Sequence, residues 1–475
     1  MNANNALFRE SDPIVSASKE PAFIALSQKS DHQSDEGYEV LRDDSKLIAF
    51  YLPQYHRIPE NSEWWGPGFT EWTSVVKGKP NFADHYQPHI PRDLGFYDLS
   101  YPDVMQEQAE LAKLYGVHGF CFYYYWFSGR RILERPLENF LKSDIDMKFC
   151  LCWANENWTR TWDGDTKSVL LAQNYVEGDD ESFIASLVDY FNDGRYIRVD
   201  GKPMLVVYRA KEIPYPSASF SKWRSLAKSH GFPGLHIAVV DFYDISRPDE
   251  VDADALVEFP PHKFNGPQSR PDKLPAITNP DFAGGIVDYS KVIAQSAKRP
   301  APPFKLYRGI IPSWDNTARR QNTSTIVVNA QPDLYGEWLG YLRAYTREHN
   351  PSKTDNFIFI NAWNEWGEGC HLEPDQKWGL QYLEQTLKSS YYTNQPSTLG
   401  QSRDALLRKV AEKMISYHDV PDGDLQAATD QLTVGLANYR PVSNFTQKVA
   451  VRLLGWPLVY GITRAAYRFF RKVRG

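Results

Sequence analysis

The sequence lacks the features that several protein classes require. It holds four cysteines in 475 residues, and none of them forms a CxxC pair, which excludes a disulfide-rich scaffold. We expect all four to be reduced thiols in the core. No apolar run reaches the roughly 18 residues of a membrane span. The N-terminal residues also lack the basic start and apolar stretch of a signal peptide. These absences favour a cytoplasmic protein.

The chain also lacks an excess of positive charge and the common nucleotide-binding motifs. The formal net charge is −6, which argues against a protein that binds nucleic acid over its whole surface. The sequence contains no P-loop, no G-x-S-x-G and no HExxH motif. No GxGxxG follows the first expected strand, where a dinucleotide site would need it. We therefore expect no cofactor.

Short apolar runs recur along the chain, and most are continuous rather than alternating. Continuous runs are typical of strands that are buried on both faces of a parallel sheet. The expected strands are Leu47–Leu52, Val117–Tyr123, Lys148–Trp153, Met204–Tyr208, Leu235–Val240, Ala255–Phe259, Leu306–Ile311 and Phe357–Ala362.

Helical patterns separate most of these runs. The expected helices are 103–115, 134–143, 181–192, 219–230, 286–298 and 334–348. The stretch between the fifth and sixth runs is too short for a full helix. Eight strands interleaved with helices predict an α/β protein with a (β/α)8 barrel, and a doubly wound open sheet is the alternative.

The chain divides into three parts. Residues 1–44 are polar and predict a flexible leader. Residues 45–390 hold the barrel pattern. Residues 391–475 predict a helical C-terminal extension whose last part, 448–475, carries seven lysines and arginines and no acid among apolar residues. This basic amphipathic segment suits an anionic membrane surface, and a helix packed on the barrel or a helix that binds a partner are the alternatives.

Aromatic residues make up 14% of the chain, and many of them adjoin carboxylates and amides. Aromatic faces stack on sugar rings, and polar groups bind sugar hydroxyls, although an aromatic-rich core would show the same composition. The candidate substrate-binding residues are Tyr55, His56, Trp64, Trp65, Glu71, Trp72, Tyr124, Tyr125, Trp126, Trp153, Asn155, Glu156, Trp158, Trp162, Trp363, Asn364 and Trp366.

The densest candidate site is the stretch NAWNEWGEGCHLEP at residues 361–374, which follows the last expected strand. Its acids Glu365 and Glu368 are three residues apart, so a helical turn would place both on one face. Two neighbouring carboxylates raise the pKa of one and leave the other ionised. Acid/base cleavage of a glycosidic bond needs that division of roles. The alternative is that these acids cap the next helix.

Two further patterns bear on metal binding. Asp163 and Asp165 form a D-x-D motif, which nucleotide-sugar glycosyltransferases use to bind a metal, but the tripeptide is common and lies in a turn-like sequence. His85 and His89 are four residues apart, with Pro88 between them opposing a regular helix. We expect neither pair to bind a metal.

Longer blocks of the chain resemble a known family. The blocks FYLPQYHRIPENSEWWGPGFTEW, HYQPHIPRDLGFYDL, YGVHGFCFYYYWFSGRRILERP, FCLCWANENWTRTWDG and NAWNEWGEGCHLEP are similar to those of the WbsX-type proteins. That group resembles glycoside hydrolase family 99, is associated with bacterial surface-polysaccharide (O-antigen, lipopolysaccharide) gene clusters and is often labelled glycosyltransferase. The resemblance covers residues 45–390 and implies a (β/α)8 barrel.

The resemblance also implies roles for the acid pair. Family 99 endo-α-mannosidases are retaining enzymes that carry an N-E-W-x-E-G motif. On this chain the motif falls on Asn364–Gly369. Carried over, Glu365 is the base for the sugar 2-hydroxyl, which attacks C1 to give a 1,2-anhydro sugar, and Glu368 is the acid/base. Gly367 departs from the larger polar residue in those mannosidases, so the chemistry transfers better than the specificity.

Three functions follow from these patterns. The leading hypothesis is an enzyme, independent of metal, that cleaves or transfers α-linked, mannose-like residues of a bacterial surface polysaccharide near the inner face of the membrane. The second is a nucleotide-sugar-dependent glycosyltransferase, and the third is a non-catalytic saccharide-binding subunit. The expected partners are an oligosaccharide or polysaccharide and an anionic membrane that residues 448–475 touch peripherally. The sequence does not fix the sugar, the linkage or the oligomeric state.

Overall fold

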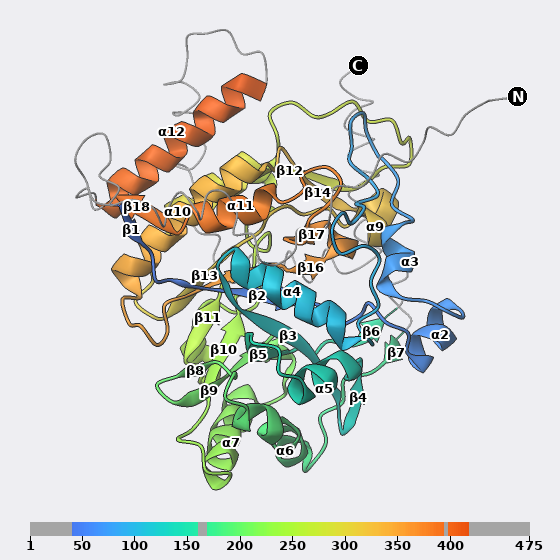
Figure 1. Ribbon diagram of the computed structural model, residues 1–475, viewed down its shortest axis with the longest axis vertical. Coiled ribbons are helices and arrows are strands. Elements are labelled where there is room, and N and C mark those ends of the chain that lie inside the picture. Colours follow the sequence, from blue (N-terminus) through green and yellow to red (C-terminus); the bar gives the residue numbers. More distant parts are fainter. Residues whose placement is uncertain (1–39, 160–168, 394–397, 418–475) are drawn as a thin grey trace, which may run out of the picture.

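The computed structural model describes residues 40–159, 169–393 and 398–417 of the chain. At its centre lies a barrel of eight parallel strands surrounded by helices (Figure 1). The strands of the barrel are β2 (Lys46–Tyr51), β3 (Val117–Phe127), β5 (Lys148–Trp153), β9 (Lys202–Val207), β10 (His236–Val240), β11 (Ala255–Val257), β13 (Leu306–Ile310) and β15 (Phe357–Ile360). Each strand falls on one of the eight apolar runs.

The barrel is closed because its last strand pairs with its first. Following the chain, β2, β3, β5, β9, β10, β11, β13 and β15 are hydrogen-bonded in that order, and β15 returns to β2 with Ile358 level with Leu47. A doubly wound sheet would instead have two edges and a reversal of strand order. The structure thus confirms the (β/α)8 barrel and excludes the open sheet.

Six long helices cover the barrel at the expected places. They are α4 (Pro102–Leu114), α5 (Arg135–Lys142), α6 (Asp179–Asn192), α7 (Pro216–Ser229), α8 (Tyr289–Lys298) and α10 (Pro332–His349). Only a 3-10 turn, η3 (Pro248–Val251), separates β10 from β11, as the short link predicts. The helix expected from residue 286 begins later, because β12 (Gly285–Asp288) pairs with β14 (Thr325–Val328). The Asp288 carboxylate then caps α8 by accepting from the Ser290 N–H at 2.8 Å.

The connections carry further short elements. They are β4 (Arg130–Ile132), β6 (Trp158–Thr159), β7 (Val169–Leu171), β8 (Arg198–Val199), α2 (Pro59–Trp65), α3 (Glu71–Val75), η2 (Ala210–Glu212), η4 (Pro267–Ser269), α9 (Thr317–Arg320), η5 (Gln321–Thr323), β16 (Asn364–Glu365), η6 (Trp366–Glu368), β17 (Cys370–His371) and α11 (Gln381–Lys388). Several of these elements build the site that is described below.

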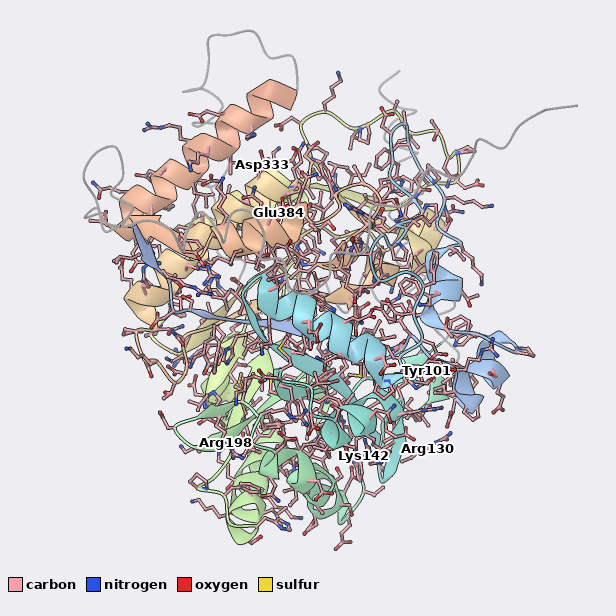
Figure 2. The ribbon with its side chains drawn as sticks, viewed as in Figure 1. Tyr101, Arg130, Lys142, Arg198, Asp333 and Glu384 are labelled. Atoms are coloured by element: carbon pink, nitrogen blue, oxygen red, sulfur yellow. The ribbon has the colours of Figure 1, made fainter. Side chains whose placement is uncertain are left out.

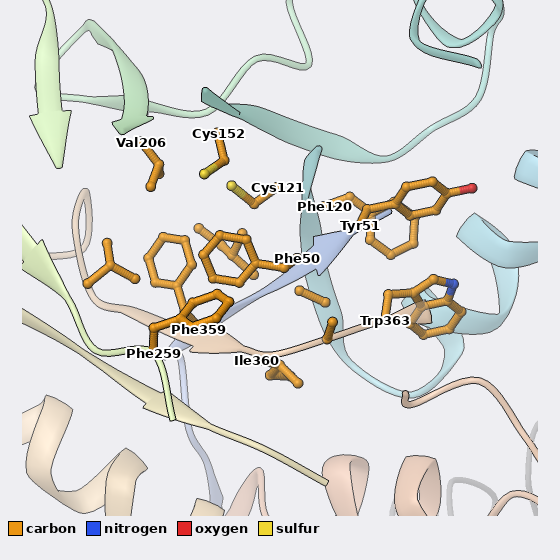
Figure 3. Close-up of a cluster of buried hydrophobic side chains, with 14 of the residues drawn as sticks. Phe50, Tyr51, Phe120, Cys121, Cys152, Val206, Phe259, Phe359, Ile360 and Trp363 are labelled. Atoms are coloured by element: carbon orange, nitrogen blue, oxygen red, sulfur yellow. The ribbon is translucent and has the colours of Figure 1, made fainter. Parts of the chain in front are cut away.

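The barrel interior is filled with side chains. The ring of Phe50 lies 4.9 Å from that of Phe259 and 5.5 Å from that of Phe359, and the thiols of Cys121 and Cys152 face the same cluster (Figure 3). All four cysteines of the chain are buried and unbridged, which confirms the expected core thiols. Charged side chains such as Lys142 on α5 and Glu384 on α11 lie on the outer surface (Figure 2).

Both ends of the described chain pack against the barrel domain. β1 (Val40–Arg42) pairs with β18 (Tyr391–Thr393), and the Asp43 carboxylate accepts from Arg343 Nη1 at 3.1 Å. Residues 40–44 of the expected leader are therefore ordered, because β18 satisfies their backbone and an arginine holds the buried acid. The remainder of the leader, residues 1–39, lies outside the described residues.

The C-terminal extension begins with α12 (Leu399–Tyr417), which covers the helical pattern expected there and packs on α8 and α10. The Lys409 ammonium on α12 lies 2.6 Å from a Glu337 oxygen on α10. Among the helices within the described ranges, none combines the length and the hydropathy that crossing a bilayer requires. The basic segment 448–475 lies outside the described residues, so its expected contact with a membrane stays a prediction.

Candidate active site

A cavity of about 490 Å³ opens at the carboxyl ends of the barrel strands. Barrel enzymes place their active sites at this end, because loops from different strands meet there. The cavity is lined by Leu52, Gln54, Tyr123, Tyr125, Ala154, Asn155, Glu156, Asn157, Trp158, Thr159, Gln173, Tyr175, Tyr208, Glu212, Phe259, Arg319, Arg320, Glu365 and Glu368. Both carboxylates of the predicted acid pair are among them.

The acid pair lies on a hairpin rather than on a helix. Glu365 belongs to β16, which pairs antiparallel with β17, and Glu368 ends the 3-10 turn η6. Gly369 then adopts a φ of 55°, in the left-handed region that favours glycine, and the chain turns back. In a 3-10 turn, residues three apart lie on the same side. The expected helical turn is therefore a 3-10 turn that Glu365 precedes and Glu368 ends, and both acids face one cavity.

Polar groups behind the cavity fix the base of this hairpin. The Asn364 side chain accepts from the Leu52 N–H at 2.7 Å and donates to the Leu52 carbonyl at 3.0 Å. The Tyr55 hydroxyl donates to the Asn364 carbonyl at 2.8 Å and accepts from the Trp366 N–H at 3.1 Å. Asn364 and Tyr55 thus hold the residues on either side of Glu365 instead of lining the cavity.

A single arginine links three carboxylates at the site. Arg319, on α9, places Nε 2.8 Å from Glu71 Oε1, Nη2 3.0 Å from Glu365 Oε2 and Nη1 3.0 Å from Glu368 Oε1. Its side chain is only 10% exposed. Hydrogen bonds between charged groups are strong where water is excluded. This guanidinium therefore sets the positions of both predicted catalytic acids.

The charges at this cluster do not balance. Burial raises the pKa of Glu365, the Arg319 guanidinium lowers it, and repulsion from Glu368 and Glu71 raises it again, so that the net shift is upward. Burial also raises the pKa of Glu71, again against the effect of Arg319. One guanidinium cannot neutralise three neighbouring carboxylates, two of them buried, so the cluster holds a proton more tightly than isolated glutamates do.

Gly367 leaves the room that this cluster needs. A Cβ atom at this position would lie 2.3 Å from Glu71 Oε1 and 2.7 Å from Arg319 Nε. Both distances are shorter than any ordinary contact of such an atom. The Glu71–Arg319 pair therefore occupies the space that a larger residue at position 367 would fill.

Asp315 links the segment that carries Arg319 to the segment that carries Glu368. Its N–H donates to the Glu368 carbonyl at 2.6 Å, and its Oδ1 accepts from the Thr317 N–H, at the start of α9, at 2.9 Å. His85 Nε2 lies 2.6 Å from the other carboxylate oxygen. The helical turn that carries Arg319 is thus tied to the hairpin that carries the acids.

The cavity receives alternate residues of β3. Tyr123 and Tyr125 line it, whereas Tyr124 and Trp126 point to the opposite face and donate hydrogen bonds to side chains of α6 at 2.9 and 3.1 Å. Trp153, at the end of β5, likewise packs its ring 4.5 Å from a ring on α6. Successive side chains of a strand point to opposite faces, so Tyr125 is the one of the three expected aromatic residues of β3 that reaches the site.

The lining of the cavity includes three further predicted substrate-binding residues, Asn155, Glu156 and Trp158. The Asn155 amide donates to the Arg209 carbonyl at 2.9 Å and accepts from the Arg209 N–H at 2.8 Å. Glu156 forms an ion pair with the same arginine at 2.9 Å. The ring of Trp64 packs 5.6 Å from that of Trp158. Trp64 therefore supports an aromatic side chain that does face the cavity.

The remaining predicted aromatics form a layer behind the site. Trp72 packs 5.6 Å from Trp366, and Trp363 is completely buried. His56 is 1% exposed, and Trp65 ends α2. None of these four side chains or Trp366 lines the described cavity. The contact of Trp72 with Trp366 supports the hairpin, which is the role that an aromatic-rich core would give it.

One group of candidates cannot be placed. Trp162, Asp163 and Asp165 lie outside the described residues. Trp162 therefore stays a predicted substrate-binding residue, and the D-x-D motif has no structural description.

Several residues that line the cavity or contact its acids and hairpin have no counterpart among the predicted site residues. Tyr123 could have been found from alternation with Tyr125 along one strand. Arg319 could not, because no motif surrounds it. The buried carboxylate of Glu373, which accepts from Trp366 Nε1 at 2.6 Å, was visible only as part of the longer sequence block. These residues are joined to the site by tertiary contacts alone.

Comparison with known proteins gives a family match. Residues 47–386 match a family model described as glycosyltransferase WbsX. Two curated relatives, each called uncharacterized protein WxcX and each from a strain of Xanthomonas campestris pv. campestris, are 40% identical over 391 residues. The match covers 80% of this chain and 56% of each relative. The chain therefore spans just over half the length of these relatives.

Similar solved structures were also found. The GH99 endo-α-mannosidase from Bacteroides thetaiotaomicron is 13% identical, with a TM-score of 0.46, and the match covers 74% of this chain and 97% of that one. A glycoside hydrolase-like protein is 15% identical, with a TM-score of 0.44, and the match covers 76% and 98%. These values carry no information on the roles of individual side chains.

Proposed function

The chain belongs to the glycosyltransferase WbsX family, and we propose that it is a carbohydrate-active enzyme that cleaves α-glycosidic bonds or transfers the α-linked sugar in the cavity of Glu365 and Glu368. One observation carries the proposal: both carboxylates line a single cavity at the carboxyl end of the barrel, and one guanidinium binds both of them. A pair of carboxyl groups that share a site divides into an acid and a base.

In the proposed reaction, Glu365 removes the proton from the sugar 2-hydroxyl, and the resulting oxygen attacks C1. The bond from C1 to the leaving oxygen breaks, and Glu368 gives its proton to that oxygen. Water or an acceptor hydroxyl then loses a proton to Glu368 and opens the 1,2-anhydro ring at C1, while O2 recovers its proton from Glu365. The raised pKa of Glu365 makes it a stronger base once it is ionised.

The proposed substrate is an α-linked, mannose-like residue of a bacterial surface polysaccharide or of its precursor. The route needs a 2-hydroxyl trans to the leaving group, as an α-mannoside has. Trp158 and Tyr125 offer aromatic surface to the sugar, and Gln54 offers an amide group. Such a mixture of stacking and hydrogen-bonding groups suits a polyhydroxylated ring.

The direct test is release of reducing ends from the surface polysaccharide of the source organism. We expect release by the wild-type chain and none by Glu368→Gln. Aryl α-mannosides sharpen the assignment. Glu368→Gln should lose most activity on poor leaving groups, which need a proton, whereas Glu365→Gln should lose activity on all of them. Full activity in either variant would contradict the assignment.

A nucleotide-sugar-dependent glycosyltransferase is the second candidate, because the family is described as one of glycosyltransferases. Calorimetry with nucleotide sugars, with and without Mn²⁺ or Mg²⁺, tests it. Binding together with transfer to an acceptor would favour this candidate over hydrolysis. A non-catalytic saccharide-binding subunit would bind sugar equally well with Glu368→Gln and would show no turnover.

A further inference from the structure

Three metal-binding side chains meet outside the cavity. His89, His371 and Asp375 are 7%, 5% and 3% exposed, and their donor atoms all lie within 4.8 Å of one another. The sequence places His89 four residues after His85, but the structure separates the two, because His85 binds Asp315. The partner of His89 is instead His371, 282 residues further along the chain.

We propose that His89, His371 and Asp375 form a binding site for a divalent transition metal ion of the zinc class. Two imidazole nitrogens and one carboxylate oxygen are the donor set that Zn²⁺ and Co²⁺ accept. Hard cations such as Mg²⁺ and Ca²⁺ prefer all-oxygen sets. None of the three side chains lines the cavity of the acid pair, so the ion would have a structural role and no part in the proposed reaction.

The hydrogen bonds around His371 prepare it as a ligand. His371 Nδ1 donates to the Glu373 carbonyl at 2.9 Å, which leaves Nε2 with a free electron pair. That Nε2 accepts from His89 Nδ1 at 2.9 Å. Histidines that bind metals are oriented in the same way, with the second nitrogen bonded to a carbonyl or carboxylate. A metal ion would replace the proton that the two imidazoles now share.

The fit needs small shifts of side chains. With metal–nitrogen bonds near 2.0 Å, tetrahedral geometry separates two ligand atoms by about 3.3 Å. The imidazole nitrogens are 2.9 Å apart, so metal binding would lengthen this distance slightly. His371 Nε2 and Asp375 Oδ2 are 4.0 Å apart, so metal binding would shorten that distance. The Trp378 N–H donates to Asp375 Oδ1 at 2.6 Å, so the carboxylate is already oriented from behind.

An ion here would support the active-site hairpin. The two loops that supply the ligands already share a main-chain hydrogen bond from the Arg92 N–H to the Pro374 carbonyl at 3.0 Å. The ring of Trp366 stacks on His371 with centroids 3.7 Å apart, and Trp366 directly follows Glu365 in the chain. The ion would link distant segments beneath the predicted base and would hold them together.

The test uses the full-length chain, stripped with a chelator and titrated with Co²⁺ and then with Zn²⁺. We expect about one equivalent of Co²⁺, with the strong visible absorption of a tetrahedral site, and displacement by Zn²⁺. The variants His371→Asn and Asp375→Asn should bind at least tenfold more weakly. The control His118→Asn changes a histidine at the opposite end of the barrel and should bind as the wild type does.

Asp375→Asn keeps the size of the side chain, so it remains informative where His371→Asn fails to fold. Zn²⁺ should raise the melting temperature of the wild type and of the His118 variant but not that of Asp375→Asn. The proposal is overturned if the wild type binds no Co²⁺, if the cobalt spectrum is that of weak octahedral binding, or if Asp375→Asn binds as tightly as the wild type. None of these outcomes depends on the tests of Glu365 and Glu368.

Discussion

Arg319 Nη2 lies 3.0 Å from Glu365 Oε2, although the two residues are 46 positions apart in the sequence. The predicted base of the reaction is therefore bound to a cation that belongs to no motif. The same guanidinium binds Glu368 and Glu71. This side chain therefore orients Glu365 and opposes the upward shift that burial gives to the pKa of Glu365.

Replacing Arg319 should cost both stability and activity. Arg319→Gln leaves three neighbouring carboxylates without a cation in a buried place, and breaking such an ion pair costs about 3–5 kcal/mol. We expect kcat/KM to fall as well, because both acids lose their anchor. Arg320→Gln is the matched control. Arg320 is exposed, and its change should alter the free energy of unfolding by less than about 0.5 kcal/mol. The free energies of unfolding are measured in urea, and an equal loss in both variants would contradict the role given to Arg319.

Gly367→Ala should disturb the same cluster by steric contact. The added methyl group would meet Glu71 Oε1 at 2.3 Å, so the Glu71–Arg319 pair must move. Overpacking of this kind costs about 1–3 kcal/mol, and we expect kcat/KM to fall. Gly340→Ala provides the control, because a Cβ there meets nothing within 4 Å and lies within a helix. That change should be neutral or stabilising by up to about 1 kcal/mol, as thermal unfolding would show.

Stability should depend on pH through Glu365. Its pKa in the folded chain is raised above the ordinary value of 4.5, so the folded state binds the proton more tightly than the unfolded state does. The stabilisation that this proton gives to the folded state is complete below pH 4.5 and is lost as the pH rises through the folded-state pKa. Its size is about 1.4 kcal/mol for each unit by which the folded-state pKa exceeds the unfolded-state pKa. The free energy of unfolding of the wild type should therefore fall relative to Glu365→Gln as the pH rises. Parallel pH curves would refute this.

Two tyrosines of β3 separate substrate binding from packing. Tyr125→Phe removes a hydroxyl that accepts from Gln54 at 2.8 Å in the cavity, and Tyr124→Phe removes one that donates to Ser186 at 2.9 Å on the outer face. Each loses one buried hydrogen bond, at about 0.5–1.5 kcal/mol of stability. Only Tyr125→Phe should also raise KM for the polysaccharide. A similar KM change in both variants would show that the alternation of side chains along β3 does not decide which of them contact the substrate.

The basic segment 448–475 should bring the chain to anionic membranes. Each lysine or arginine near such a surface contributes about 1 kcal/mol, and salt screens the attraction. The full chain should sediment with vesicles of phosphatidylglycerol at low salt, and a chain that ends at residue 447 should not. Neutral vesicles and high salt serve as controls. If the full chain stayed in the supernatant, the segment would instead be a helix packed on the barrel or one that binds a partner.

The repeating pattern of apolar runs was sufficient to predict the barrel. Strands buried on both faces must be apolar throughout, so runs such as Lys148–Trp153 mark a strand directly, and that strand has the predicted bounds. The pattern was less reliable where a segment with a helical pattern can instead pair as a strand with a distant segment. Residues 286–288 are within a helical pattern, yet they form a strand because β14 offers them a partner.

The sequence by itself determined the eight strands of the barrel and the spacing of the acid pair, because both are set by residues close together in the chain. Glu365 and Glu368 are three positions apart and reach one cavity through a single local turn. The tertiary structure alone decided what surrounds them. Closure of the barrel brings Glu71 and Arg319 to the acids and His89 to His371. No local spacing encodes such contacts, because they depend on how separate loops meet at one end of the barrel.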